Sequence, residues 1–381
     1  MQLRSILASA VICTIAACSD VQSTAPIAAP AAPSLSQSSQ AAGGVFVSTN
    51  GLNGNAVVAF ARAADGSLSP TGTFATGGTG IGGVGDPLAS QFAVALSPNA
   101  KFLVVANAGS NDVSSFAVDG GSLSLVDRAA SGGTRPVSVA VSKDYVYALN
   151  TLSNTIGVLA IGSDGSLTAL PGKTKALPAG ANGSAEVRLS PNGHLLVVSE
   201  RVSNRLETFT VGSDGSLGDG VVTSDAGNTP FGFDFTTRGQ VIVSEAASAS
   251  ASSYNVNDDG SLSVVSAAAA TLQRAPCWLI VNNSGRFAYT ANAGSATITG
   301  FSVAANGALS LLTSTGVSGD LGAGAQPLDL DMSRNGNFLY VMKNGTGTIG
   351  GFAVGGDGGL TPLADTPGLV ARAGYMGLAA Y

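Results

Sequence analysis

Ionisable side chains recur at two kinds of position in this sequence. The first kind ends a short apolar stretch, where Asn107 and Asn292 show the usual residue and Glu200, Glu245 and Lys343 replace it. Asparagine at such a position suits capping of a hairpin backbone. Two carboxylates and an ammonium on one side of the fold could instead bind a polar ligand or act in acid–base catalysis. Both interpretations stay open for the three charged residues.

The second kind of position lies inside predicted strands. Glu186 and Arg188 alternate along residues 185–190, and Asp234 and Asp331 take matching positions in two later stretches. Charged side chains at core positions are costly unless they are paired or functional. A bridge between Arg188 and Asp234 is one interpretation, and a catalytic role for either residue is the other. The catalytic candidates are Glu186, Arg188, Glu200 and Arg201, and the ligand-binding candidates are Glu245, Lys343, Asp234, Asp331 and Arg274.

Residue types exclude several catalytic machineries. His194, the only histidine, stands beside a Pro-Asn-Gly turn, where we expect it to be exposed. A Ser-His-Asp triad and a His/Cys metal cluster are therefore not predicted. Cys277 is expected to be a buried thiol, because no histidine is available to activate it. The sequence predicts neither a metal nor a cofactor.

The elements that must position these residues come from an internal repeat. A turn of the type Asp-Gly-Ser-Leu occurs in seven copies, which end at Leu68, Leu123, Leu167, Leu217, Leu262, Leu309 and Leu360. The steps between these leucines are 44–55 residues. In the fourth unit, residues 185–190, 194–200, 205–211 and 216–223 have the composition of four short strands. Four antiparallel strands repeated at this spacing predict the blades of a β-propeller.

The two ends of the repeat complete each other. The folded part begins with a second-type strand at residues 44–50, and residues 374–381 form a first-type strand with nothing after it. Pairing them closes one blade and removes open sheet edges. The prediction is an all-β, seven-bladed propeller over residues 44–381. On its inner strands, Phe92, Val94 and Leu96 are expected to share a face that packs between blades.

The N-terminus predicts export. Arg4 precedes the apolar stretch 6–17, which is too short to span a bilayer, and the ending Ile-Ala-Ala-Cys resembles a bacterial lipobox. We expect a signal peptide at 1–17, lipid attachment to Cys18 and a flexible Ala/Pro/Ser-rich tether at 18–43. By resemblance to Gram-negative lipoproteins, Ser19 favours the outer membrane. The net charge of −6 and the absence of a basic patch exclude nucleic acid as a partner, and a monomer is expected.

The stretch "SAEVRLSPNGHLLVVSERVSNRLETFTV" (184–211) resembles the lactonase family of seven-bladed propellers, which includes 6-phosphogluconolactonase and a fungal muconate-lactonizing enzyme. Glu186, Arg188 and Arg201 fall on the family pattern, and Glu200 replaces its asparagine. The resemblance implies anion binding and proton transfer on a lactone. The family's Pro-Arg-His element is absent, because residues 132–141 read "GGTRPVSVAV".

Two functional hypotheses follow. In the first, the chain is a cell-envelope hydrolase of a lactone or related sugar-acid ester, with Glu186, Glu200 or Glu245 as base and Arg188 or Arg201 holding the anion. In the second, it is a non-catalytic propeller that binds a glycan, a small metabolite or an envelope protein. Fold alone does not choose between them.

Overall fold

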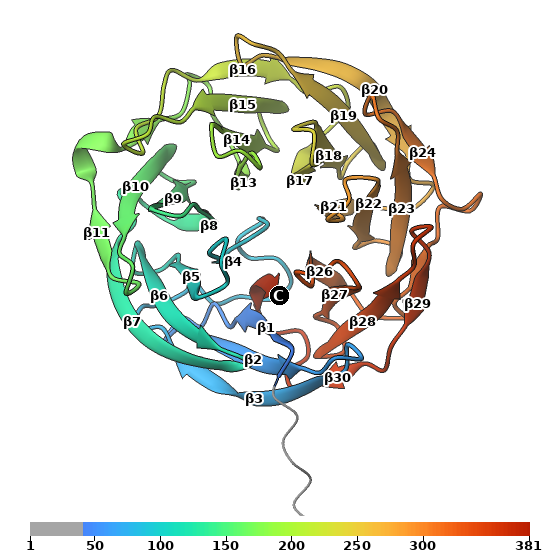
Figure 1. Ribbon diagram of the computed structural model, residues 1–381, viewed down its shortest axis with the longest axis horizontal. Helices are drawn as coiled ribbons and strands as arrows, with labels where there is room; N and C mark the ends of the chain where they lie inside the picture. The colour runs from blue at the N-terminus through green and yellow to red at the C-terminus, as the bar shows by residue number, and fades with distance from the viewer. Residues whose placement is uncertain (1–40) are drawn as a thin grey trace, which may run out of the picture. The chain divides into compact units, whose positions relative to one another are not determined.

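The computed structural model describes residues 41–381, in which seven antiparallel sheets surround a central hub (Figure 1). The predicted signal peptide, Cys18 and most of the predicted tether lie outside the described residues. Residues 40–381 form one compact unit by themselves. No helix among the described residues has the length and apolarity needed to cross a membrane. The predicted seven-bladed, all-β propeller is confirmed.

Each sheet is a blade whose four main strands lie side by side, with the first strand at the hub and the fourth at the outer edge. The inner strands are β31 (Met376–Ala380), β4 (Val94–Leu96), β8 (Pro136–Val141), β13 (Ser184–Leu189), β17 (Pro230–Phe235), β21 (Pro276–Val281) and β26 (Pro327–Met332). The second strands are β1 (Gly43–Ser48), β5 (Phe102–Asn107), β9 (Tyr145–Asn150), β14 (Leu195–Glu200), β18 (Val241–Glu245), β22 (Phe287–Asn292) and β27 (Phe338–Lys343).

The outer half of each blade follows the same order. The third strands are β2 (Ala56–Arg62), β6 (Asp112–Asp119), β10 (Thr155–Ile161), β15 (Arg205–Thr210), β19 (Ser250–Val256), β23 (Thr297–Val303) and β28 (Thr348–Val354). The fourth strands are β3 (Leu68–Ala75), β7 (Ser122–Ala130), β11 (Leu167–Ala169), β16 (Val221–Ser224), β20 (Leu262–Ala270), β24 (Leu309–Leu311) and β29 (Leu360–Pro362). Shorter elements accompany three blades: η1 (Pro171–Lys173), β12 (Lys175–Ala176), β25 (Gly319–Asp320) and β30 (Thr366–Pro367).

The repeated Asp-Gly-Ser-Leu turn leads into the outer strand of its blade. In the fourth blade, the N–H and hydroxyl of Ser216 both donate to Asp214 Oδ1, at 3.1 and 2.6 Å. Gly215 has a φ of 81°, which glycine adopts without steric cost. The repeated residues therefore serve to form the turn.

The ring is closed by pairing of the two chain ends, as the sequence predicted. β31 pairs with β1, with Phe46 opposite Ala379, and the rings of Phe46 and Tyr381 stack at 6.2 Å. Arg62 fastens this junction: Nε donates to Tyr381 O at 2.9 Å and Nη2 donates to Ala42 O at 2.6 Å. Its side chain is nearly fully buried. One guanidinium thus joins both ends of the described chain.

Replacement of Arg62 by alanine should destabilise the propeller by about 2–3 kcal/mol, because the carbonyls of Ala42 and Tyr381 lose a charged donor. Unfolding in guanidinium chloride measures this change. Arg128→Ala is the control, because Arg128 contacts Asp112 at 2.9 Å but is 46% exposed. That exposed pair should contribute less than about 1 kcal/mol. Equal effects of the two substitutions would contradict a closing role for Arg62.

All inner strands run in the same direction along the hub axis. They therefore finish at one end, where hairpins connect six of them, all but β31, to the second strands of their blades. We call this the hairpin end. The second strands return to the opposite end, where Glu200 and the other strand-ending residues lie. The two groups of charged candidates are thus separated along the axis.

Candidate active site in the hub

A short segment, Ser90–Phe92, crosses the hub and closes it. The Gln91 amide pairs with the Leu279 backbone, donating from Nε2 to O at 2.8 Å and accepting from N–H at 2.9 Å. Trp278 Nε1 donates to Ser90 O at 3.0 Å, and the Phe92 N–H donates to Asp329 Oδ2 at 2.9 Å. Gln91 is fully buried. We call Ser90–Phe92 the hub plug.

Phe92 departs from the sequence prediction. Strand β4 begins only at Val94, and Phe92 has a φ of 54°, a left-handed conformation that bulky residues rarely adopt. Its ring faces the hub pocket, and the Arg188 guanidinium lies over it with Cζ 4.3 Å from the ring centre. The prediction that Phe92 packs between blades with Leu96 is therefore wrong. Strain of this kind persists where surrounding contacts impose it, and it is concentrated at ligand sites.

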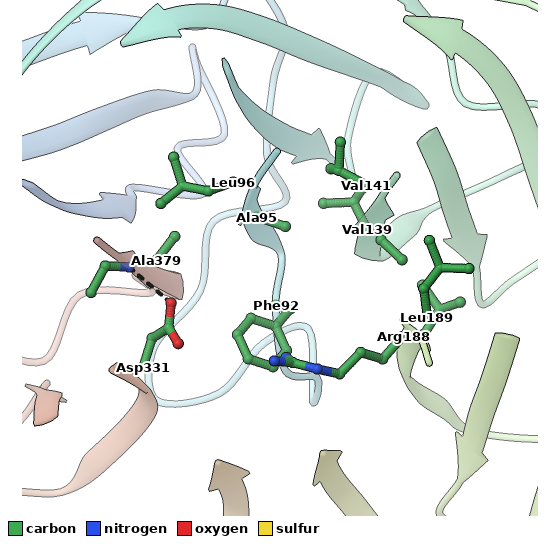
Figure 2. Close-up of a pocket in the computed structure, with 12 residues that line it drawn as sticks. Phe92, Ala95, Leu96, Val139, Val141, Arg188, Leu189, Asp331 and Ala379 are labelled. Atoms are coloured by element: carbon green, nitrogen blue, oxygen red, sulfur yellow. Dashed lines mark hydrogen bonds between the residues drawn. The ribbon is translucent and has the colours of Figure 1, made fainter. Parts of the chain in front are cut away.

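Beyond the plug, the hub is hollow toward the hairpin end. One cavity of about 240 Å³ is lined by Phe92, Ala95, Leu96, Val139, Ala140, Val141, Val187, Arg188, Leu189, Asp331, Ala379 and Ala380. A second cavity of about 280 Å³ shares Arg188 and Asp331 and adds Asp234, Asn282 and Asn283. Figure 2 shows Arg188 and Asp331 reaching the first cavity from different sides. We call the two cavities together the hub pocket.

Arg188 is the basic residue of the hub pocket. Its Nε lies 2.7 Å from Asp234 Oδ1, and its Nη1 lies 4.0 Å from Glu186 Oε1. The predicted bridge between Arg188 and Asp234 is therefore present. Burial disfavours the charged guanidinium, but Asp234 and Glu186 outweigh this effect and raise the pKa of Arg188. The side chain stays 27% exposed, so a ligand can reach it.

The hub carboxylates join neighbouring blades. Glu186 Oε2 accepts the Phe233 N–H at 2.7 Å, and Asp234 Oδ2 accepts the Val281 N–H at 2.9 Å. Asp331 Oδ2 accepts the Ala380 N–H at 2.9 Å. In each pair the acceptor belongs to one inner strand and the donor to the next blade. The edge of each inner strand that faces the axis has no neighbouring strand. These carboxylates accept hydrogen bonds from buried N–H groups on that edge.

Burial also changes the acidity of these groups. It raises the pKa of Asp331 to about 7 and that of Asp329 to about 8. Backbone N–H donors act in the opposite direction and lower both pKa values, but burial has the larger effect. It raises the pKa of Glu186 well above its usual range, and Glu186 Oε1 has no hydrogen-bond partner in the described chain. Burial of Glu186 therefore favours the protonated form of its carboxyl. Asp331 is poised near neutrality and partly exposed, as a general base must be.

The raised pKa values predict an unusual pH dependence of stability. Between about pH 4 and pH 8, folded Asp329 holds a proton that the unfolded chain has released. Its contribution to stability is complete below about pH 4 and is lost as the pH rises through about 8. Asp331 acts in the same direction. Guanidinium unfolding at pH 5 and pH 8 should show the lower free energy of unfolding at pH 8.

The slope can reach about 1.4 kcal/mol per pH unit for each group. Asp329→Asn should make it shallower, because the amide does not titrate. A wild-type protein that is equally stable, or more stable, at pH 8 than at pH 5 would refute the assignment of a protonated Asp329.

The strand-ending charges lie inside their own blades. Glu200 is fully buried, its Oε2 accepts from Arg205 Nε at 3.0 Å, and Arg205 Nη2 lies 2.6 Å from Glu207 Oε1. Glu245 Oε2 accepts the Ser250 hydroxyl at 2.5 Å. Lys343 is paired with Asp365. The three residues do not form the shared ligand site that was one interpretation of the sequence.

Blades with asparagine at the end of the second strand explain this arrangement. Asn292 Nδ2 donates to the hydroxyls of Thr297 and Thr299, at 3.1 and 2.9 Å. Positions n, n+5 and n+7 thus form a buried polar group that joins the second and third strands. In the fourth blade the same positions hold Glu200, Arg205 and Glu207. This spacing is visible in the sequence and could have shown that the charges pair locally.

The remaining candidates also lie away from the hub pocket. Arg201 is at the opposite end of the axis, with Cζ 5.6 Å from the centre of the Phe231 ring. Arg274 is exposed, and its Nη2 donates to Gly294 O at 2.8 Å. Burial raises the pKa of Cys277 to about 12, which leaves the thiol protonated. His194 is exposed, as expected. Within residues 41–381, no three His, Cys, Asp or Glu side chains are grouped as a metal would require.

Comparison with known proteins agrees with the fold. The family described as "Lactonase, 7-bladed beta-propeller" matches residues 38–174, 133–280 and 264–371. The chain therefore belongs to this lactonase family.

Individual relatives are distant. A 6-phosphogluconolactonase of Serratia proteamaculans is 26% identical over 41% of this chain, and one of Yersinia pestis is 32% identical over 23%. These matches span 48% and 28% of the relatives' own lengths. The periplasmic gluconolactonase of Pseudomonas aeruginosa has a TM-score of 0.67 at 16% identity, over 89% of this chain and 98% of that one. A protein from Lactobacillus plantarum gives 0.72 at 20%, over 89% and 99%. At these identities the structures show a shared fold alone.

Proposed function

We propose that this chain hydrolyses the lactone of a small hydroxy acid in the hub pocket. The observation that carries the proposal is the pairing of Arg188 and Asp331, which line the same cavity from different blades. One is a permanent cation with an exposed edge, and the other is a carboxyl whose pKa is about 7. Membership of the lactonase family and relatives named as 6-phosphogluconolactonases support the same reaction class.

The chemistry needs no further residue type. Asp331 takes a proton from water as the water oxygen attacks the carbonyl carbon of the lactone. Arg188 donates hydrogen bonds to the carbonyl oxygen, where negative charge develops. The bond between the carbonyl carbon and the ring oxygen then breaks. The ring oxygen receives the proton from Asp331, and the product is the open hydroxy acid.

Proton release from a panel of five- and six-membered lactones tests the proposal, with residues 40–381 as the enzyme. Asp331→Asn should lower turnover by about 100-fold or more, the usual contribution of a positioned base. Asp259→Asn changes an exposed carboxylate in an outer turn and serves as the control. Turnover that is negligible in the wild-type protein, or equal in wild type and Asp331→Asn, would end the proposal.

A second candidate function is binding of a sugar acid or related metabolite without turnover. It is favoured by the contacts of Asp331, whose two oxygens already accept the N–H groups of Met332 and Ala380 at 2.8 and 2.9 Å. It is also favoured by the burial of Glu186 and Glu200. Saturable binding of hydroxy acids with no lactone turnover would support this function over hydrolysis.

We also propose that the propeller works in the cell envelope, attached through lipid on Cys18. The apolar leader and the Ile-Ala-Ala-Cys sequence support this placement. Incorporation of labelled palmitate into the wild-type chain, and its loss in Cys18→Ser, is the expected result. Equal labelling of both chains would contradict lipid attachment at Cys18.

A further inference from the structure

We propose that the hub pocket selects unphosphorylated ligands with an apolar face: short aliphatic hydroxy acids and their lactones, in preference to phosphorylated or polyhydroxylated ones. This inference rests on the proposed site, but its test measures binding and so does not depend on turnover. It follows from the charge, the lining and the size of the hub pocket.

The charge of the hub pocket opposes a phosphate. Arg188 is the only basic residue among residues 41–381 that lines either cavity, and its Nε already contacts Asp234. Asp331 lines both cavities, and Glu186 and Asp329 are buried just behind the surface. A phosphate monoester carries a charge of about −1.5 to −2 at pH 7. One shared guanidinium can match a carboxylate, but among the described residues no second cation lines either cavity to match the further charge of a phosphate.

The lining of the first cavity opposes a polyhydroxylated ring. Apart from Arg188 and Asp331, its side chains are one phenyl ring and aliphatic groups, among them Val139, Val141 and Leu189 (Figure 2). A hydroxyl turned toward this wall would lose its hydrogen bonds to water without replacement. Polar partners such as Asn282 and Thr237 line the second cavity only. The ligand should therefore have one polar edge and one apolar face.

The size of the hub pocket restricts the ligand further. Cavities of about 240 and 280 Å³ lie at or below the lower end of the range for drug-sized ligands. The hub plug blocks the way through the hub, so a long ligand cannot thread the axis. A single ring or a short open chain fits these limits.

Calorimetric titration of residues 40–381 with three open acids tests the selection. The acids are 5-hydroxyhexanoate, gluconate and 6-phosphogluconate, which successively add hydroxyl groups and a phosphate. We expect 5-hydroxyhexanoate to bind at least tenfold more tightly than gluconate, and 6-phosphogluconate to bind most weakly. Binding of 6-phosphogluconate as tightly as either other acid would overturn the inference, and so would binding of none of them. The expected order without lactone turnover would uphold the inference and refute only the hydrolysis.

Two variants test whether the apolar wall of the first cavity causes the ligand preference. Val141→Thr preserves side-chain shape and places a hydroxyl on the apolar wall, so the preference for 5-hydroxyhexanoate over gluconate should fall at least threefold. Val222→Thr makes the same change on β16, where the residue is 44% exposed and lines neither cavity, and should leave the preference unchanged. An unchanged preference in Val141→Thr would contradict selection by this wall.

Discussion

Replacement of Arg188 by glutamine should weaken binding of hydroxy acids, and slow lactone turnover, by about 10- to 150-fold. The guanidinium is the single cation that the described part of the chain brings to the hub pocket, and hydrogen bonds to a charged group contribute about 1.5–3 kcal/mol each. Glutamine keeps a polar side chain but is shorter and has no charge. Direct titration with 5-hydroxyhexanoate gives the change in Kd, and proton release gives the change in kcat/KM.

Two comparisons make this result specific. Arg286→Gln removes an exposed guanidinium outside the pocket lining and should leave Kd unchanged. Arg201→Gln tests the other end of the axis, because Arg201 belongs to the family pattern but lies beside Phe231. If Arg201→Gln lowers turnover and Arg188→Gln does not, the reaction takes place at that opposite end and the hub pocket is not the active site.

The propeller itself could be predicted because its determinants are local and repeated. Each Asp-Gly-Ser-Leu turn fixes the entry to one outer strand, and seven similar units leave few alternatives to a closed ring. Closure by the chain ends followed from a second-type strand at the start and a first-type strand at the finish. Both predictions depend only on the order of strand types along the chain, and the repeat makes that order visible in the sequence.

The candidate site could be predicted only in part. Alternation along the inner strands correctly directed Arg188, Asp234 and Asp331 to the axis, because successive residues on a strand face opposite sides. The same reasoning could not place Glu200, since a residue at a strand end can face the axis or the blade interior. The pairing with Arg205 decided the matter, and it depends on the n+5 spacing across a hairpin.

The hub plug was missed for a different reason. Residues 76–93 join two blades without regular secondary structure, so no periodicity indicates where they run. Phe92 could be assigned to a strand face only by assuming that β4 begins before Val94. Its left-handed conformation is imposed by hydrogen bonds from three other blades, through Val139, Leu279 and Asp329. Such long-range contacts leave no local signal in the sequence.

Replacement of Asp329 by leucine should be the most destabilising single change in the hub, at about 3–6 kcal/mol. Asp329 is fully buried, and its Oδ2 accepts the N–H groups of Phe92 at 2.9 Å and Leu378 at 3.1 Å. Its Oδ1 accepts the Leu330 N–H at 2.9 Å. Leucine fills similar space but leaves three buried donors without an acceptor, and each such donor costs about 1–3 kcal/mol.

The free energy of unfolding in guanidinium chloride measures the loss, and Asp329→Asn is the matched variant. The asparagine oxygen can still accept from Phe92 and Leu378, which tie the hub plug and the closing strand β31 to the seventh blade. Asparagine should therefore cost only about 1–2 kcal/mol. If leucine and asparagine destabilise equally, the donors find other acceptors and Asp329 does not join these elements. If leucine costs less than about 1 kcal/mol, the other hydrogen bonds of the hub plug hold it in place, and the strained Phe92 needs no carboxylate to support it.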